Sequence, residues 1–290
     1  METGIETDQQ LAPLRVGIQG YPGAFHHLAA EAFYAGKSIE IKSYHHFVPL
    51  AHSVAEENEL DSGLMAIENS LAGSLLPNYH LLLNYSLQIK GEIYLRIRQN
   101  LMALAGQQMS DLKEVYSHPV AIEQCRPFFA DYPHIRLIEA EDTALSALRI
   151  QQSNKKGVGA IASELAGRLY NLEVLKPGIE SNHQNYTRFL VLGKEQEQGA
   201  IFQKPKVSIC FSLGHEVGTL AQVLSVLANL GLNLIKIQSV PIHGTPWIYR
   251  FFVDFLLPEQ TTVSTVIHFL KPEVKEFRFL GIYEAGNHIQ

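Results

Sequence analysis

Along residues 15–177, short apolar segments typical of strands alternate with amphipathic segments that have helical spacing. The strands of successive units begin near Val16, Gly63, Glu114, Ile135 and Gly159. Repeated strand–helix units favour a mainly parallel, doubly wound sheet with helices on both faces. Residues 87–104 lack a strong helix break, which is consistent with a strand pair that crosses between two lobes. We therefore expect a layered α/β fold for this part of the chain.

The pattern restarts after residues 194–205, which have the polar composition of a linker. Residues 206–285 then contain alternating and helically spaced apolar positions in the order βαββαβ. This order over about 80 residues is typical of a small ferredoxin-like domain. We expect a second, separate domain over residues 206–285.

Composition excludes several classes of function. A formal net charge of −6 disfavours a general nucleic-acid binder, which needs a basic face. No apolar run approaches the roughly 20 residues needed to span a bilayer, and the acidic, polar residues 1–13 do not resemble a signal peptide. Two cysteines, Cys125 and Cys210, are too few for a disulfide framework and fit a reducing compartment. A cytoplasmic protein that contacts neither membrane nor nucleic acid is expected.

Thirteen histidines invite a metal hypothesis, especially the pairs His26-His27 and His45-His46. Adjacent side chains on a helix or strand point in different directions, and no HExxH or paired-cysteine spacing accompanies them. We predict no metal site.

Polar clusters follow several of the predicted strands, where layered α/β proteins bind ligands. One is Asn185-Tyr186-Thr187-Arg188-Phe189, which runs into the apolar segment Leu190-Val191-Leu192. Arg188 offers a planar donor fork suited to a carboxylate, and Thr187 offers a hydroxyl. Taken alone, the motif fits a polar strand cap equally well. Other clusters contain Asn69, Ser117 with Gln124, and Glu141 before Asp142 and Thr143, where helix capping is the ordinary role.

In this order and spacing, four motifs resemble the prephenate dehydratase family: Ala66-Ile67-Glu68-Asn69-Ser70, Ser117-His118-Pro119, Ile161-Ala162-Ser163-Glu164-Leu165-Ala166 and Asn185-Tyr186-Thr187-Arg188-Phe189. The resemblance extends from about Arg15 to Tyr283. It implies a catalytic domain over residues 14–193 similar to the two-lobed type II periplasmic-binding-protein fold, followed by an ACT regulatory domain. One lobe would hold residues 14–100 and 178–193, and the other residues 101–177. The tail before residue 15 is too short for a helical chorismate mutase domain, so a monofunctional enzyme is expected.

The resemblance implies a lyase that removes carbon dioxide and water from prephenate, giving phenylpyruvate on the route to phenylalanine, without a cofactor. Such an enzyme must orient a dianion, desolvate the departing carboxylate and protonate the leaving hydroxyl. The family's key threonine falls on Thr187, with Arg188 as the natural carboxylate partner. Asn69, Ser117, Gln124 and Phe189 fall on positions that bind substrate. Glu141 also falls on such a position, and its carboxyl becomes a candidate proton source if burial raises its pKa.

The ACT resemblance depends on Glu216-Val217-Gly218-Thr219-Leu220 and on Gly231-Leu232-Asn233-Leu234. It implies that phenylalanine binds between paired ACT domains and inhibits the enzyme, and that the chain forms a dimer or tetramer. The implied effector residues are Gly218, Thr219, Leu220, Asn233, Leu234 and Ser239. The chain departs from the family where Gln238-Ser239-Val240-Pro241 replaces the usual Glu-Ser-Arg-Pro. It departs again at Gly23-Ala24-Phe25-His26-His27, where the family usually has Gly-Thr-Phe-Ser-His.

Two alternatives remain open. Arogenate dehydratase performs the same chemistry on the aminated substrate, and these motifs do not separate the two activities. A non-catalytic, amino-acid-responsive binding protein would share the lobed fold. Such a protein has no evident use for a Thr-Arg pair beside Ser117 and Asn69.

Overall fold

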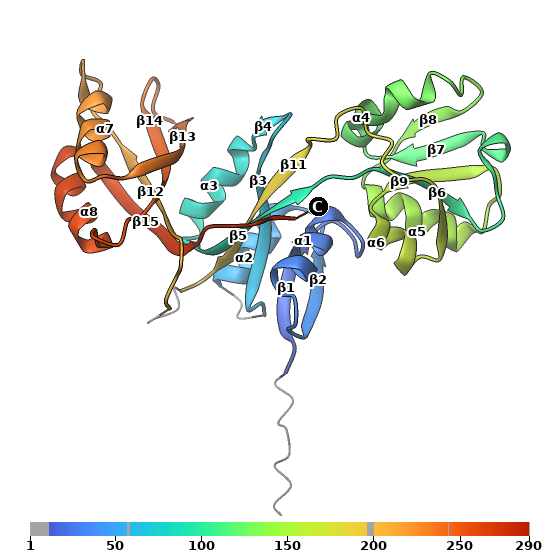
Figure 1. Ribbon diagram of the computed structural model, residues 1–290, viewed down its shortest axis with the longest axis horizontal. Helices are drawn as coiled ribbons and strands as arrows, with labels where there is room; N and C mark the ends of the chain where they lie inside the picture. Colours follow the sequence, from blue (N-terminus) through green and yellow to red (C-terminus); the bar gives the residue numbers. More distant parts are fainter. Residues whose placement is uncertain (1–11, 57–58, 196–199, 243, 290) are drawn as a thin grey trace, which may run out of the picture.

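The computed structural model describes residues 12–56, 59–195, 200–242 and 244–289. Three β-sheets lie side by side in an elongated molecule, each with helices packed against it (Figure 1). The first and second sheets form the two lobes, which consist of residues 14–193 together with the C-terminal strand of residues 288–289, and the third sheet belongs to the C-terminal domain. Among the described residues, no helix has both the length and the apolar character needed to cross a bilayer.

The first lobe, in the middle of Figure 1, contains a seven-stranded sheet in the order β16-β5-β11-β3-β1-β2, with β4 paired to β3. Its strands are β1 (Leu14–Gln19), β2 (Ile39–Tyr44), β3 (Ser62–Asn69), β4 (Gly73–Ser74), β5 (Gln88–Arg96), β11 (Tyr186–Gly193) and β16 (His288–Ile289). Its helices are α1 (Phe25–Phe33), α2 (Phe47–Ala55) and α3 (Leu76–Asn84). The middle of β3 is apolar on both faces because Met65 and Ile67 enter one core while Leu64 and Ala66 enter another.

The second lobe contains a five-stranded sheet in the order β10-β6-β9-β7-β8. Its elements are β6 (Asn100–Leu104), the 3-10 turn η1 (Met109–Asp111), β7 (Glu114–Ser117), α4 (Pro119–Phe129), β8 (Arg136–Glu139), α5 (Thr143–Ser153), β9 (Val158–Ala162), α6 (Glu164–Leu169) and β10 (Leu172–Lys176). The chain crosses between the lobes after β5 and again before β11. The two crossings are tied together because Ile97 N donates to Asn185 O at 2.8 Å and Ile179 N donates to Gln99 O at 2.9 Å.

The C-terminal domain is a four-stranded antiparallel sheet in the order β13-β14-β12-β15. Its elements are β12 (Pro205–Ser212), α7 (Thr219–Asn229), β13 (Asn233–Pro241), β14 (Tyr249–Leu256), α8 (Val263–Leu270), the 3-10 turn η2 (Lys271–Glu273) and β15 (Lys275–Glu284). The order βαββαβ is the one that the apolar pattern predicts. Residues 196–199 of the predicted linker lie outside the described residues.

The C-terminal domain shares a core with the first lobe. Phe252 and Tyr283 from the C-terminal sheet are buried in one cluster with Leu190 of β11 and Tyr79 of α3. The chain then returns to the first lobe, where β16 adds a parallel strand to the free edge of β5. No sequence pattern indicates this return, because two residues are too few for a recognisable strand pattern.

Candidate active site

A pocket of about 280 Å³ lies between the two lobes, beside the crossings of the chain. It takes residues from β3 and β11 of the first lobe and from the helix starts of both lobes. Its lining is Ala24, Phe25, His26, Ala66, Asn69, Ala72, Leu75, Ile97, Gln99, His118, Val120, Ala121, Gln124, Asp142, Thr143, Thr187 and Phe189. Four residues that the sequence singles out as substrate or catalytic residues therefore share one pocket: Asn69, Gln124, Thr187 and Phe189.

Thr187 and Asn69 form the centre of the site. They are register partners on the antiparallel strands β11 and β3, and Asn69 Nδ2 donates to Thr187 Oγ1 at 3.0 Å. The same Nδ2 donates to Asn185 Oδ1 at 2.7 Å, while Asn69 Oδ1 accepts from the backbone of Leu71 and Ala72. These contacts fix the orientation of the amide. Because Thr187 Oγ1 is an acceptor for Asn69, its own proton can point into the pocket.

Three helix N-termini meet at this pocket. The pocket lining includes the first residues of α1 (Phe25, His26), the start of α4 (His118, Val120) and the start of α5 (Asp142, Thr143). The free N–H groups and the positive end of a helix dipole favour anions. No lysine or arginine is among the lining residues that the structure describes. An anion in this pocket would therefore depend on backbone donors and neutral side chains.

Gln99 is a site residue that sequence analysis missed. It lies on the first crossing, 3% exposed, and its Nε2 donates to Gln124 Oε1 at 3.3 Å. Glu180, on the second crossing, accepts from Gln99 N at 2.9 Å and so holds the residue in place. The Oε1 atom of Gln99 is buried without a partner among the described residues. The available signal was the polar pair Gln99-Asn100 directly before the apolar run Leu101-Met102-Ala103-Leu104.

His26 is a neutral component of the lining. Its ring packs edge-on against Phe189, with the centroids 4.8 Å apart, and its Nε2 is buried. Burial lowers the pKa of His26 from 6.5 to about 3. The imidazole therefore carries no charge near neutral pH.

Ser117 lies close to the site but not in the pocket lining. Its hydroxyl is fully buried and donates to Ile161 O at 2.7 Å, which ties β7 to β9 in the second lobe. The following residue, His118, lines the pocket and caps α4 by accepting from Val120 N at 3.3 Å. In this structure the side chain of Ser117 therefore supports the start of α4.

The role predicted for Arg188 does not fit the geometry and is corrected. Successive side chains on a strand point to opposite faces, so Arg188 faces away from the pocket that Thr187 lines. The guanidinium is 4% exposed and lies at the C-terminal domain, where it donates to Glu92 at 2.7 Å, Asp254 at 2.6 Å and Tyr283 at 3.2 Å. It is therefore not available as the partner of a substrate carboxylate.

Glu141 was a candidate proton source only if its carboxyl were buried, and it is not buried. Its side chain is 57% exposed and is absent from the pocket lining. It lies 3.8 Å from His45 Nδ1 and 3.6 Å from Arg149 Nη2, as part of a solvent-exposed pair network. The neighbouring Asp142 lines the pocket instead, where burial raises the pKa of its carboxyl. Exposure removes the physical basis for Glu141 as a proton source.

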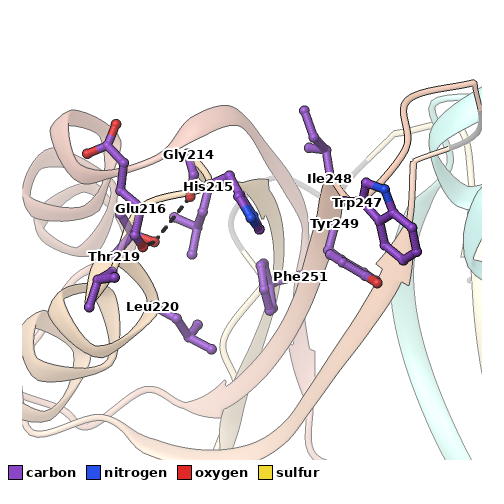
Figure 2. Close-up of a pocket in the computed structure, with 11 residues that line it drawn as sticks. Gly214, His215, Glu216, Thr219, Leu220, Trp247, Ile248, Tyr249 and Phe251 are labelled. Carbon is purple, nitrogen blue, oxygen red and sulfur yellow. Dashed lines mark hydrogen bonds between the residues drawn. The ribbon is translucent and has the colours of Figure 1, made fainter.

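A second pocket lies in the C-terminal domain, between the loop before α7 and the end of the β13–β14 hairpin (Figure 2). It has a volume of about 320 Å³, and its lining includes Thr219 and Leu220 from the predicted effector set. Figure 2 shows His215, Phe251 and Tyr249 around the opening. Gly218 precedes α7 with φ +88°, a conformation that favours glycine.

The other predicted effector residues lie elsewhere on β13. Asn233 pairs with Leu256 at one end of β13, whereas Pro241 pairs with Tyr249 at the pocket end. Ser239 pairs with Phe251, which lines the pocket. Asn233 and Leu234 therefore cannot reach the pocket of their own chain. Among the described residues, no cluster of three or more histidine, cysteine or acidic side chains is arranged to hold a metal ion.

The fold and pocket define a class: a two-lobed α/β protein with a pocket between its lobes and an attached ferredoxin-like domain. The family model for prephenate dehydratase matches residues 16–197. The bifunctional chorismate mutase/prephenate dehydratase of Escherichia coli K12 is 31% identical over 277 residues, covering 94% of this chain and 71% of the relative. Arogenate dehydratase 2 of Petunia hybrida is 36% identical over 294 residues, covering 95% and 73%.

A solved prephenate dehydratase from Arthrobacter aurescens, in complex with L-Phe, has the same fold. It superposes with a TM-score of 0.81 at 24% identity, covering 93% of this chain and 90% of that one. The chain belongs to the prephenate dehydratase family. The predictions of a two-lobed fold with a C-terminal antiparallel domain, and of a hydro-lyase of phenylalanine biosynthesis, are confirmed.

Proposed function

We propose that the interlobe pocket binds prephenate and converts it to phenylpyruvate, carbon dioxide and water, with Thr187 as the group that assists departure of the hydroxyl. The observation that carries this proposal is the Thr187–Asn69 pair at 3.0 Å, facing a pocket bounded by three helix N-termini. A hydroxyl whose lone pair is occupied by an amide is oriented to donate. Converging helix N-termini supply the positive potential that a dianion needs.

Different parts of the pocket lining serve different steps of the reaction. The helix starts at Phe25 and Thr143 offer backbone donors that can orient the two carboxylates. Apolar residues, including Ile97 and Phe189, exclude water from part of the pocket. A carboxylate held against such a surface loses hydration, which favours its departure as neutral carbon dioxide. The pocket therefore supports loss of the carboxylate with the substrate held in a fixed orientation.

We assign to Thr187 the protonation of the leaving hydroxyl. As the ring carboxylate leaves as carbon dioxide, the electrons of the broken C–C bond move through the ring and expel the hydroxyl at the opposite carbon. Thr187 donates a hydrogen bond to that oxygen, which takes up one proton, supplied in the end by solvent, and departs as water. Its pocket is closed enough for such a bond to be strong, since Thr187 is 8% exposed. A threonine hydroxyl is a weak acid, so its role is to stabilise the leaving oxygen and pass on a proton.

Arogenate is the second candidate substrate, and one observation favours it. Asp142 is the one carboxylate among the described residues that line the pocket. Arogenate carries an ammonium group that such a carboxylate could bind, whereas prephenate has an uncharged ketone at that position. However, Asp142 Oδ1 already accepts from Leu145 N at 2.9 Å as the cap of α5. A capping carboxylate is partly neutralised by the helix it caps, so we favour prephenate.

The experiment that tests the function uses the purified chain with each substrate separately. Formation of phenylpyruvate from prephenate at a kcat/KM well above that for phenylalanine formation from arogenate supports the proposal. The reverse preference assigns arogenate. No turnover of either substrate by the folded protein would contradict a dehydratase site and favour a non-catalytic, amino-acid-responsive binding protein.

We also propose that phenylalanine binds the C-terminal domain. The start of α7 after Gly218 offers donors for a carboxylate, and Leu220 and Phe251 offer an apolar wall for a phenyl ring. Because Asn233 and Leu234 lie at the far end of β13, they could contact the same ligand only from a second copy of the chain. This arrangement supports a dimer or tetramer that pairs C-terminal domains. The cytoplasmic location and the lack of a cofactor stay predictions.

A further inference from the structure

On strands β3 and β11, the pocket residues Asn69 and Thr187 each adjoin a residue that contacts the C-terminal domain. Thr187 pairs in register with Asn69, and Arg188 pairs with Glu68. Thr187 and Asn69 line the pocket. Arg188 and Glu68 instead contact side chains of the C-terminal sheet. Because the residues are adjacent on the same strands, a shift of Arg188 or Glu68 moves the backbone that carries the site.

Arg188 is held by both domains. It donates to Glu92 of β5 in its own lobe, and to Asp254 of β14 and Tyr283 of β15 in the C-terminal domain. Burial opposes the charge of Arg188, but Asp254, Tyr283 and Glu92 outweigh it and raise the pKa of the guanidinium well above its ordinary value. The planar guanidinium of Arg188 can donate to these three partners in one orientation only. The position of Arg188 is therefore set jointly by the two domains.

Glu92 extends the same cluster. Lys206 Nζ of β12 lies 2.9 Å from both of its carboxylate oxygens, and Gly286 N, just before β16, donates to Oε1 at 3.0 Å. An added Cβ at Gly286 would lie 2.7 Å from Glu92 O, so only glycine permits this approach. Two cations and two carboxylates thus form a cluster of zero net charge, which we name the domain-junction cluster: Arg188, Glu92, Lys206 and Asp254.

A second contact lies on the neighbouring strand. Lys236 Nζ of β13 lies 2.8 Å from Glu68 Oε1 and donates to Ser74 Oγ of β4 at 3.0 Å. The strand β13 also carries Ser239, whose partner Phe251 lines the pocket of the C-terminal domain. The two strands of the active site are therefore each linked to a different strand of the C-terminal sheet.

We propose that Arg188 and Glu68 are positioning residues through which the C-terminal domain holds Thr187 and Asn69 in catalytic register. The proposal depends on the proposed role of Thr187. The domain-junction cluster is buried, so breaking one of its pairs leaves an uncompensated charge and forces local rearrangement. A rearrangement of about 1 Å is enough to lower turnover by about 100-fold. The C-terminal domain thereby becomes part of the catalytic geometry as well as a binding module.

The test compares two carboxylate-to-amide variants of the full chain, both within the C-terminal sheet. Asp254→Asn breaks the contact of 2.6 Å to Arg188, and Glu276→Gln breaks a contact of 2.7 Å to Arg250 inside the same domain. We expect Asp254→Asn to lower kcat and kcat/KM for prephenate together, by about 10- to 100-fold, because it disturbs the transition-state geometry. Glu276→Gln should leave both constants unchanged.

Two further variants keep the proposal open to refutation. If Asp254→Asn does not fold, Tyr283→Phe removes only the hydroxyl that Arg188 Nη2 contacts, and it should lower kcat in the same direction by a smaller factor. Lys236→Met tests the Glu68 contact in the same way. Folded Asp254→Asn or Tyr283→Phe with wild-type kcat, even if its melting temperature is lower, would overturn the proposal.

A parallel Thr187→Ala variant separates this failure from failure of the proposed function. If Thr187→Ala loses turnover while the junction variants keep it, the site is right and the positioning role is wrong. If Thr187→Ala keeps turnover, the proposed site itself is wrong.

Discussion

Gly23 is where the loop after β1 touches the second lobe, and substitution there should separate the lobes. Its φ of +89° lies in the left-handed region, where an alanine costs about 1–2 kcal/mol. A Cβ added at Gly23 would also lie 2.8 Å from Ala166 Cα and 3.0 Å from Ala166 Cβ in the other lobe. Because carbon atoms in contact lie about 3.5–4.0 Å apart, the lobes must move apart by about 1 Å.

Moving the lobes apart would stretch two hydrogen bonds that join them beside the pocket. Ser163 Oγ donates to Gly23 O at 2.5 Å, and the Tyr170 hydroxyl donates to Pro22 O at 2.6 Å, both from the second lobe to the first. Since a displacement of 1 Å can lower a rate by about 100-fold, Gly23→Ala should lower kcat/KM by about that factor. The strain is small against a typical folding free energy of about 5–15 kcal/mol, so the variant should still fold.

The assay is steady-state formation of phenylpyruvate, with thermal unfolding as the measure of stability. Gly36→Ala is the matched control, because Gly36 has φ +83° and an added Cβ there meets nothing within 4 Å. It carries the same backbone strain without the contact between lobes. Gly36→Ala should lower the melting temperature and leave kcat/KM unchanged. Wild-type kcat/KM in folded Gly23→Ala would refute the reasoning about lobe contact.

Three further outcomes follow from the same contacts. Burial lowers the pKa of His26 from 6.5 to about 3, so between these pH values the unfolded chain binds a proton that the folded chain does not, and the free energy of unfolding falls as the pH decreases. Urea unfolding should show that this free energy is about 2 kcal/mol lower at pH 5 than at pH 7, and His26→Gln should remove most of the difference. Gln99→Ala should raise KM for prephenate more than it lowers kcat, because it removes an amide that lines the pocket, and equal effects on both constants would argue against a binding role. Calorimetric titration should detect phenylalanine binding to the wild type and not to Gly218→Val, whose side chain strains a backbone at φ +88°; equal affinity in both would place the ligand elsewhere.

The fold was largely accessible from the sequence because its signals are local. Apolar periodicity predicted the strand–helix alternation, and the restart near residue 206 predicted the C-terminal domain. What periodicity could not predict was long-range pairing, such as the insertion of β11 between β3 and β5 and the return of β16 to β5. These depend on contacts between residues about 100 or more positions apart, which no window of sequence contains.

The candidate site was partly accessible for a related reason. Polar clusters at strand ends and helix starts singled out Thr187, Asn69 and Gln124, and the family resemblance assigned them to the substrate site; the structure brings the three into one pocket. Arg188 was assigned to the substrate because it adjoins Thr187, although strand alternation directs it to the opposite face. Its real partners are Glu92, on the neighbouring strand β5, and Asp254, on the C-terminal sheet, and they could be found only in three dimensions. Adjacency in sequence was the wrong guide to adjacency in the site.

The account centres on the hydroxyl of Thr187, and the most direct test is the turnover of prephenate by Thr187→Ala beside Thr187→Ser. Serine keeps a hydroxyl that Asn69 can orient, whereas alanine removes it. We expect Thr187→Ala to lower kcat by about 10²- to 10⁴-fold, the range for a positioned proton donor, and Thr187→Ser to retain most of the activity. Folded Thr187→Ala with kcat near that of the wild type would contradict the central claim.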